Sequence, residues 1–328
     1  MVLQGEESME KKKISLIVPC YNEAGNVAAF YNWVKECYGS RISETEFVFV
    51  DDGSKDDTYK ELKKIYENKG KEDVTVISFS RNFGKESGIF AGLEYASGKY
   101  VCIIDADLQQ SPEVVMQMEN ILDNDENIDC VTAFQTVRHE GKVLELLKKT
   151  FYKVINQMTE VDFVSGASDF RMFRENVKNA ILMLPEKDRF SKGIFSWIGF
   201  HTEYLPYEAC DRHAGTSKWS FKKLLKYGLG GIMSFTVTPL KCATFAGGVL
   251  SIISLIYFLV VLCQKLFMGI SIPGYPTLVC LILLLGGIQL IMLGIIGEYL
   301  GRTYIEGKNR PVYLARVVLK EEKNEKNN

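Results

Sequence analysis

The stretch YVCIIDADLQQSPE, residues 100–113, contains the pattern that decides the fold. Its apolar part, Val101–Ile104, is short and rich in β-branched residues, which is typical of a buried strand. The run ends at Asp105-Ala106-Asp107, and a stretch with helical periodicity follows it. The stretch therefore predicts a strand that ends in acidic residues and leads into a helix.

The same arrangement recurs on both sides of this stretch. Short apolar runs alternate with helix-period segments, and the other runs are Ile14–Val18, Phe47–Val50, Val74–Phe79 and Cys130–Phe134. Alternation of this kind favours an α/β domain with a mostly parallel sheet covered by helices on both faces. A chain of 328 residues is long enough to bury such a core.

Polar residues follow each of the first four runs. In parallel sheets, ligands bind outside the carboxyl ends of the strands, so these segments are the expected functional ones. They are Pro19–Glu23, Asp51–Ser54, Ser80–Asn82 and Asp105–Asp107. No GxGxxG follows a strand and no GxxxxGK[ST] occurs, which excludes the usual dinucleotide and P-loop sites.

The acidic strand ends suggest a nucleotide held with a cation. Alternate residues of an extended chain share a side, so Asp105 and Asp107 can converge on one Mg²⁺ or Mn²⁺ ion, with Gln109 as a further ligand or support. Such a cation would let an acidic domain bind a polyphosphate. Asp51 and Asp52 can accept hydrogen bonds from a ribose or a base. Together they predict one nucleotide bound across the edge of the sheet.

Charge is divided unevenly along the chain. Residues 1–217 carry 26 basic and 36 acidic side chains, whereas residues 218–328 carry 13 and 5. The acidic body argues against binding to DNA or RNA, because phosphate backbones are bound by the opposite charge.

The last third of the chain contains two apolar runs that predict membrane-spanning helices. Cys242–Gln264 and Thr277–Gly297 carry no charge, and each is long enough as a helix to cross about 30 Å of hydrocarbon. Basic residues flank both outer ends, which places those ends in the cytoplasm. Just before the first run, residues 218–235 place lysines on one face and apolar residues on another, as in an interfacial helix, although an ordinary surface helix has the same pattern.

Seven motifs in order resemble family 2 glycosyltransferases with the GT-A fold. The resemblance covers roughly residues 14–300, and its branch is the polyprenyl-phosphate glycosyltransferases, meaning bactoprenol glucosyltransferases and dolichol-phosphate mannose synthases. The family commonly reads DADLQDPPE where this chain has DADLQQSPE. The motifs are Ile17–Glu23, Val50–Ser54 with Asp57-Thr58, Ser80–Lys85, Ala91–Leu93, Asp105–Gln109, Asp169–Arg171 and Arg212–Lys218.

The resemblance implies roles for individual residues. Those that would line the nucleoside pocket are Pro19, Tyr21, Glu23 and Asp52, with Asp51 beside them. Those that would hold Mg²⁺ or Mn²⁺ on the donor diphosphate are Asp105, Asp107 and Gln109. Arg212 and Lys218 would close over the diphosphate, with Ser217 beside them. The candidates for binding the lipid phosphate are Arg138, Lys142 and Lys149. Asp169 would lie near the acceptor as an orienting or weakly basic group.

The implied activity is that of an inverting, metal-dependent hexosyltransferase of cell-envelope biogenesis. It would move a hexose from a nucleotide sugar to polyprenyl phosphate, with UDP-glucose as first choice and UDP-N-acetylglucosamine or GDP-mannose as alternatives. Two readings from other classes are a processive polysaccharide synthase and a non-catalytic nucleotide-sugar-binding membrane scaffold. The expected partners are the nucleotide sugar, the lipid and the membrane; a homo-oligomer is left open.

The expected organisation has five parts, with both termini and the catalytic domain on the cytoplasmic side of the membrane. They are a flexible N-terminus at 1–13, a GT-A catalytic domain at 14–217, an interfacial helix at 218–235, two transmembrane helices at 236–300 and a tail at 301–328.

Overall fold

The computed structural model describes residues 12–70, 72–135, 156, 167–184, 186–187, 189–210, 236–268 and 274–321. These residues form two units. The first is a sheet unit, made by the described residues up to Cys210 together with Pro311–Glu321, and the second is a helical unit at 236–310.

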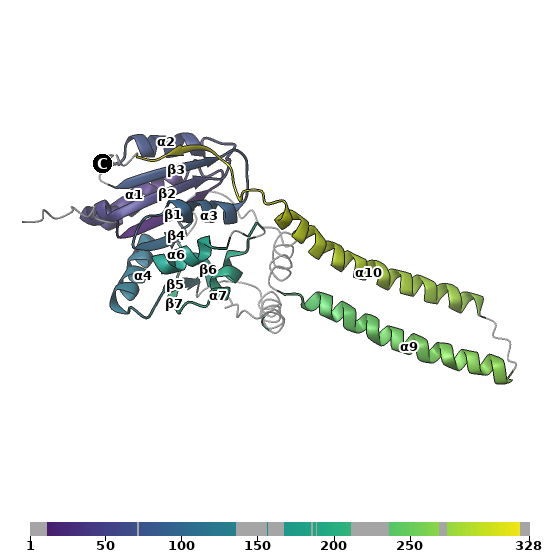
Figure 1. The fold of residues 1–328 in the computed structure, drawn as a ribbon. Coiled ribbons are helices and arrows are strands. Elements are labelled where there is room, and N and C mark those ends of the chain that lie inside the picture. Colours follow the sequence, from purple (N-terminus) through teal and green to yellow (C-terminus); the bar gives the residue numbers. More distant parts are fainter. Residues whose placement is uncertain are drawn as a thin grey trace, which may run out of the picture. The chain divides into compact units, whose positions relative to one another are not determined.

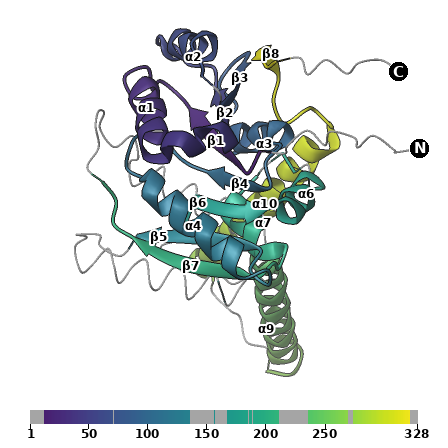
Figure 2. The same cartoon turned by 90° about the vertical axis from the view of Figure 1, so that its left-hand side faces the viewer.

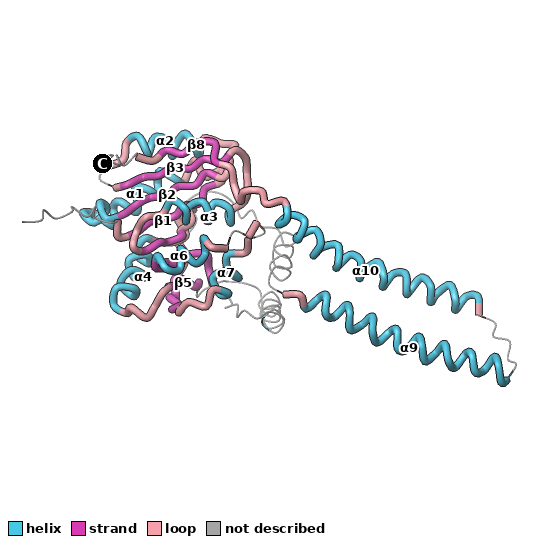
Figure 3. Tube along the Cα trace, viewed as in Figure 1, coloured by secondary structure: helices cyan, strands magenta, loops and turns pink. Residues whose placement is uncertain are grey.

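Within the described residues, the sheet unit contains one eight-stranded sheet in the order β7-β5-β6-β4-β1-β2-β3-β8, whose strands are labelled in Figure 2 and coloured magenta in Figure 3. Four neighbouring pairs are parallel, namely β1 with β2, β1 with β4, β2 with β3 and β5 with β7, and the others are antiparallel. The strands are β1 Ile14–Cys20, β2 Thr45–Asp51, β3 Asp73–Phe79, β4 Tyr100–Ile103, β5 Cys130–Gln135, β6 Ala167–Arg174, β7 Thr202–Tyr207 and β8 Ala315–Leu319.

Helices cover the sheet on both faces (Figures 1 and 2). Helices α1, α2 and α4 lie on one face, and α3, α6 and α7 lie on the other. A short 3-10 helix, Gly39–Glu44, follows α1. The helices are α1 Val27–Tyr38, α2 Thr58–Glu67, α3 Lys85–Tyr95, α4 Pro112–Asn124, α6 Glu175–Leu182 and α7 Ser191–Trp197.

The predicted fold class is confirmed, because each of the five apolar runs forms a strand, β1 to β5. Their side chains are buried between the helix layers, which explains why these runs are apolar on both faces rather than alternating. Phe47 and Phe49 of β2, for example, stack at 5.7 Å and are fully buried. The parallel strands β1 to β4 therefore bring their carboxyl ends to one edge of the sheet.

Three strands were not anticipated from the sequence. β6 carries a buried arginine, Arg171, and β7 contains Pro206, so neither has the apolar pattern of the central strands. β8 lies in the segment expected to be a C-terminal tail, and it pairs antiparallel with β3 at the edge of the sheet.

Tyr313, just before β8, fixes the returning chain on the sheet unit. Its ring stacks on Phe79 with the centroids 4.8 Å apart, and its hydroxyl donates to Glu94 at 2.5 Å. The backbone N–H of Ser80 donates to the carbonyl of Leu314 at 2.9 Å. The chain that follows the second apolar helix is thus anchored beside the end of β3.

We expect Tyr313→Ala to destabilise the sheet unit by about 2–3 kcal/mol, because it removes a stacked ring and a hydrogen bond. Tyr313→Phe keeps the ring and should cost only about 1 kcal/mol. Thermal unfolding of the full chain in detergent, followed by tryptophan fluorescence, checks both variants. Equal stability of the alanine variant and the wild type would show that the anchor contributes nothing.

The helical unit contains α9, Thr238–Met268, and α10, Tyr275–Gly307. Both described helices are long and apolar enough to cross a membrane by length and composition, over Thr238–Val261 and Leu284–Gly307. Within this unit, the Tyr299 hydroxyl of α10 donates to the carbonyl of Thr236 at 2.7 Å. The two apolar segments predicted from the sequence are therefore helical. The interfacial helix expected at 218–235 and the flexible N-terminus expected at 1–13 lie outside the described residues, except for residues 12 and 13.

Candidate active site

The carboxyl ends of β1 and β2 are joined by a network of loop hydrogen bonds. Asn22 has a left-handed backbone, with φ of 55°. Its N–H donates to the Ser54 hydroxyl at 3.0 Å, and its side-chain oxygen accepts from the N–H of Lys55 at 2.9 Å. The two loops expected to hold a nucleoside therefore form one connected surface.

The predicted nucleoside residues Pro19, Tyr21 and Glu23 are half-buried on the β1 side of this surface. Pro19 pairs in register with Val50 of β2. A Glu23 carboxylate oxygen accepts from the Asn26 side chain at 2.7 Å, at the start of α1.

Asp51 has a structural environment. It is 1% exposed, and its carboxylate accepts from the N–H of Ser54 at 3.0 Å and from the Ser78 hydroxyl at 2.8 Å. Arg316 of β8 in turn approaches the Ser78 hydroxyl at 3.4 Å. Asp51 thus holds the turn after β2 and links it to β3.

Asp52 fixes the loop that follows β3. It is 3% exposed, and its two carboxylate oxygens accept from the N–H groups of Phe83 at 2.6 Å and Gly84 at 2.9 Å. This contact positions the chain directly before α3. The nucleoside role that the sequence assigns to Asp52 stays a prediction.

The environment of Asp52 predicts a pH dependence of stability. Burial raises the pKa of Asp52 to about 6, although the two backbone N–H groups act in the opposite direction. A carboxyl group whose pKa is higher in the folded state binds its proton more tightly there. Its stabilising contribution is therefore complete below the unfolded pKa, near 3.8, and is lost as the pH rises through about 6.

We expect the unfolding free energy of the wild type, measured against Asp52→Asn, to fall by about 2–3 kcal/mol between about pH 4 and pH 7. Denaturant unfolding of both proteins in detergent at the two pH values checks this. Parallel pH dependences for the two proteins would refute the assignment.

Lys85 joins the carboxylates at the ends of two strands. Its ammonium lies 2.7 Å and 3.0 Å from the two oxygens of Asp105, which follows β4, and 3.3 Å from Asp169 of β6. The Lys85 ammonium therefore contacts both Asp105, which is predicted for the donor side, and Asp169, which is predicted for the acceptor side. Asp169 Oδ1 is buried and has no hydrogen-bond partner among the described residues.

The charges of this centre shift the pKa values of its members. Burial acts to lower the pKa of Lys85, but the carboxylates of Asp105 and Asp169 outweigh it and raise that pKa above its usual value. Burial acts to raise the pKa of Asp169, but Lys85, Lys192 and Arg171 lower it to about 2. Both Lys85 and Asp169 are therefore charged at neutral pH.

The turn after Asp105 shapes the rest of the predicted metal site. Leu108 has φ of 60°, and the N–H of Gln109 donates to Asp107 at 3.2 Å. The side chain of Gln110 accepts from the N–H of Asp105 at 2.8 Å and donates to its carboxylate at 3.2 Å. Gln110, which departs from the common family sequence, therefore supports Asp105 directly.

These oxygen donors fit a hard divalent cation that arrives with a phosphate ligand. In the described residues, no group of three or more His, Cys, Asp or Glu side chains is placed to hold a metal ion. Mg²⁺ bound with nucleotides usually takes only one or two carboxylates and completes its shell with phosphate oxygens and water. The unpartnered oxygen of Asp169 also marks a polar site that a ligand or water would complete.

Six predicted site residues lie outside the described part of the chain, namely Arg138, Lys142, Lys149, Arg212, Ser217 and Lys218. The described chain does approach the predicted metal site shortly before three of them. The N–H of Cys210, two residues before Arg212, donates to the carbonyl of Gln109 at 3.1 Å.

Lys85 is the main site residue that had no individual role assigned from the sequence. Its local signal is its place at the end of the motif Ser80–Lys85, directly after Gly84 and at the start of α3. Its partners are 20 and 84 residues further along the chain, so the contact depends on the strand order rather than on local spacing.

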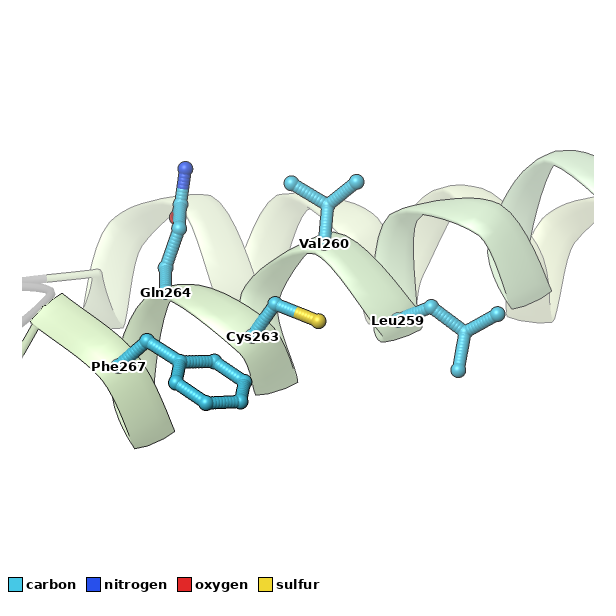
Figure 4. Close-up of a pocket in the computed structure, with 5 residues that line it drawn as sticks. All are labelled: Leu259, Val260, Cys263, Gln264 and Phe267. Carbon is cyan, nitrogen blue, oxygen red and sulfur yellow. The ribbon is translucent and has the colours of Figure 1, made fainter.

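The helical unit has an apolar depression on α9. The depression is lined by Leu259, Val260, Cys263, Gln264 and Phe267 (Figure 4). None of these side chains is a carboxylate or a cation, and all lie on a helix long enough to cross a membrane.

Comparisons with known proteins agree with the family resemblance of the motifs. The profile of glycosyl transferase family 2 matches residues 15–181. The chain is 42% identical to the putative glycosyltransferase CsbB of Bacillus subtilis, over 94% of this chain and 92% of that protein. It is 39% identical to the SfII prophage-derived bactoprenol glucosyl transferase of Shigella flexneri, over 93% of this chain and 97% of that protein.

A solved structure of S. aureus TarS, residues 1–349 with UDP-GlcNAc, superimposes with a TM-score of 0.48 at 18% identity. The superposition covers 68% of this chain and 66% of the TarS chain. The mostly parallel mixed sheet with helices on both faces is the GT-A-like arrangement that the sequence predicts. From the profile match and the two relatives, the chain belongs to glycosyl transferase family 2.

Proposed function

We propose that the protein is an inverting hexosyltransferase that moves a hexose from a nucleotide sugar to polyprenyl phosphate at the cytoplasmic face of the membrane. UDP-glucose is the first-choice donor, and UDP-N-acetylglucosamine and GDP-mannose are the alternatives. The observation that carries the proposal is the similarity to bactoprenol glucosyl transferases over 93% of the chain, which includes the two apolar helices.

On the donor side, the loops after β1 and β2 bind the nucleoside through Pro19, Tyr21, Glu23 and Asp52. Asp105 and Asp107, with Gln109, hold a divalent cation together with the diphosphate. When bound, such a cation supplies Lewis-acid stabilisation of the charge that develops on the leaving diphosphate. Arg212 and Lys218 close over the diphosphate with Ser217 beside them, and the contact of Cys210 with Gln109 supports this placement.

On the acceptor side, the nucleophile is a phosphate monoester. Its second pKa is about 6, so it is largely dianionic at neutral pH and needs no strong base. Asp169, with one oxygen near Lys85 at 3.3 Å, orients the acceptor rather than taking a proton. Arg138, Lys142 and Lys149 grip the lipid phosphate. A single displacement at the anomeric carbon inverts its configuration.

The apolar helices bring the enzyme to its lipid substrate. A membrane anchor replaces a search in three dimensions by encounters at high effective concentration on the leaflet. Lys241 precedes the apolar part of α9, and Arg302 and Lys308 lie near the end of α10. Because basic residues that flank membrane spans usually lie in the cytoplasm, these charges favour a cytoplasmic location for the start of α9 and the end of α10. The described helices, by length and composition, support the two-span arrangement.

The test is incubation of the purified protein in detergent with radiolabelled nucleotide sugars, with and without added undecaprenyl phosphate, followed by solvent extraction. We expect label in the lipid fraction from one donor, and only when the lipid is added. Label in a long polymer would instead indicate a processive synthase, and binding of the donor without transfer would indicate a scaffold.

A further inference from the structure

Lys85 occupies the place next to the carboxylate that the proposed cation would use. Its ammonium contacts both oxygens of Asp105, at 2.7 Å and 3.0 Å. A bound divalent cation would therefore compete with this ammonium for the same negative charge.

The side chain of Lys85 is partly exposed, but the backbone beside it is held by a buried residue. Lys85 is the first residue of α3 and follows Gly84, whose φ is 100°. The N–H of Gly84 donates to the buried carboxylate of Asp52 at 2.9 Å. The backbone at Lys85 is thus held by a fixed support, and its side chain extends to both Asp105 and Asp169.

Electrostatics makes a free cation and Lys85 incompatible at close range. Two positive groups that share one carboxylate repel each other strongly at separations of a few ångströms. A diphosphate changes this balance, since its oxygens bind a divalent cation and also accept hydrogen bonds from an ammonium. The cation and Lys85 can then share the anion instead of competing for Asp105.

We propose that Lys85 makes cation binding at Asp105 conditional on the nucleotide diphosphate, so that the cation binds weakly alone and tightly together with the donor. Lys85 is a positioning residue in this scheme. The Lys85 ammonium neutralises Asp105 and Asp169 before the donor binds, and it turns toward the diphosphate once the donor is bound. The inference rests on the proposed donor site and adds the order in which that site is filled.

The test measures binding rather than turnover. Mn²⁺ binding to the full chain in detergent is followed by electron paramagnetic resonance, with and without UDP. We expect UDP to tighten Mn²⁺ binding to the wild type. In Lys85→Gln, Mn²⁺ alone should bind more tightly, and the tightening by UDP should shrink by about tenfold.

Two further variants separate this role from a simple ion pair. Lys85→Arg keeps the charge and should keep the coupling between Mn²⁺ and UDP. Lys13→Gln is the matched control, because Lys13 also bridges two carboxylates, Glu119 at 2.7 Å and Asp123 at 2.9 Å. Lys13 lies just before the amino end of β1, whereas the candidate site lies at the carboxyl ends of the strands. Lys13→Gln should leave the coupling unchanged. Lys85→Met serves as a second neutral variant if the glutamine variant does not fold.

Two results would overturn the inference, and they differ in what else they affect. If a folded neutral variant binds Mn²⁺ with wild-type affinity and wild-type coupling to UDP, Lys85 is an ordinary ion-pair residue and the proposed function stands. If the wild type binds neither Mn²⁺ nor UDP, the donor site itself is wrong and the inference fails with it.

Discussion

Asp107→Ala is expected to abolish sugar transfer while the protein stays folded and membrane bound. Asp107 is half-buried in the turn after β4 and is one of two carboxylates proposed to hold the cation. Removing one such electrostatic contact to the leaving group costs about 10²–10³-fold in rate, and loss of the cation would cost more. Transfer of labelled sugar to lipid by the purified variant is the measurement.

The control for this variant separates charge from turn geometry. The Asp107 carboxylate also accepts a hydrogen bond from the N–H of Gln109 at 3.2 Å, so alanine removes a hydrogen bond as well as a charge. Asp107→Asn keeps an acceptor oxygen and removes only the charge. We expect both variants to be inactive and to melt near the wild-type temperature. Near-normal turnover in either one would reject the assignment of Asp107 as a metal ligand.

Gly53→Ala is expected to destabilise the sheet unit and to weaken nucleotide binding. Gly53 has φ of 62°, and an added Cβ would lie 2.4 Å from the carbonyl carbon of Arg81 and 2.7 Å from the backbone N of Asn82. The positive φ alone costs a residue with a side chain about 1–2 kcal/mol. The clash adds to this cost, because Asp52 holds the loop that would have to move.

Gly25→Ala is a matched control for this substitution. Gly25 lies in the neighbouring loop after β1, and a Cβ there would meet no atom within 4 Å. We expect Gly53→Ala to lower the melting temperature by at least several degrees and to weaken UDP binding, whereas Gly25→Ala changes neither. If the two alanine variants behave alike, the close contact between the loops after β2 and β3 is not important.

The central part of the fold could be predicted because its signal is local. Strands β1 to β5 are apolar runs buried between two helix layers, so composition alone marks them. β6 could not be recognised in this way, because Arg171 is buried in it with its guanidinium over the ring of Phe195 at 4.0 Å. β8 could not either, since it follows an apolar helix and is ordered by pairing with a distant strand, β3.

The candidate site was predictable to a similar degree. Asp105 and Asp107 stand out because they directly follow a buried strand. Asp169 has no such local signal and was named only through the family resemblance. Its neighbour Lys85 was not assigned, because β6 comes to lie beside β4 only when the chain folds.

The most direct test of the proposed mechanism is sugar transfer to undecaprenyl phosphate by the purified protein in excess chelator. With UDP-glucose as the first donor tried, the proposal predicts that lipid-extractable label disappears in EDTA and returns when Mg²⁺ or Mn²⁺ is added in excess. Transfer at the same rate with and without chelator would contradict it.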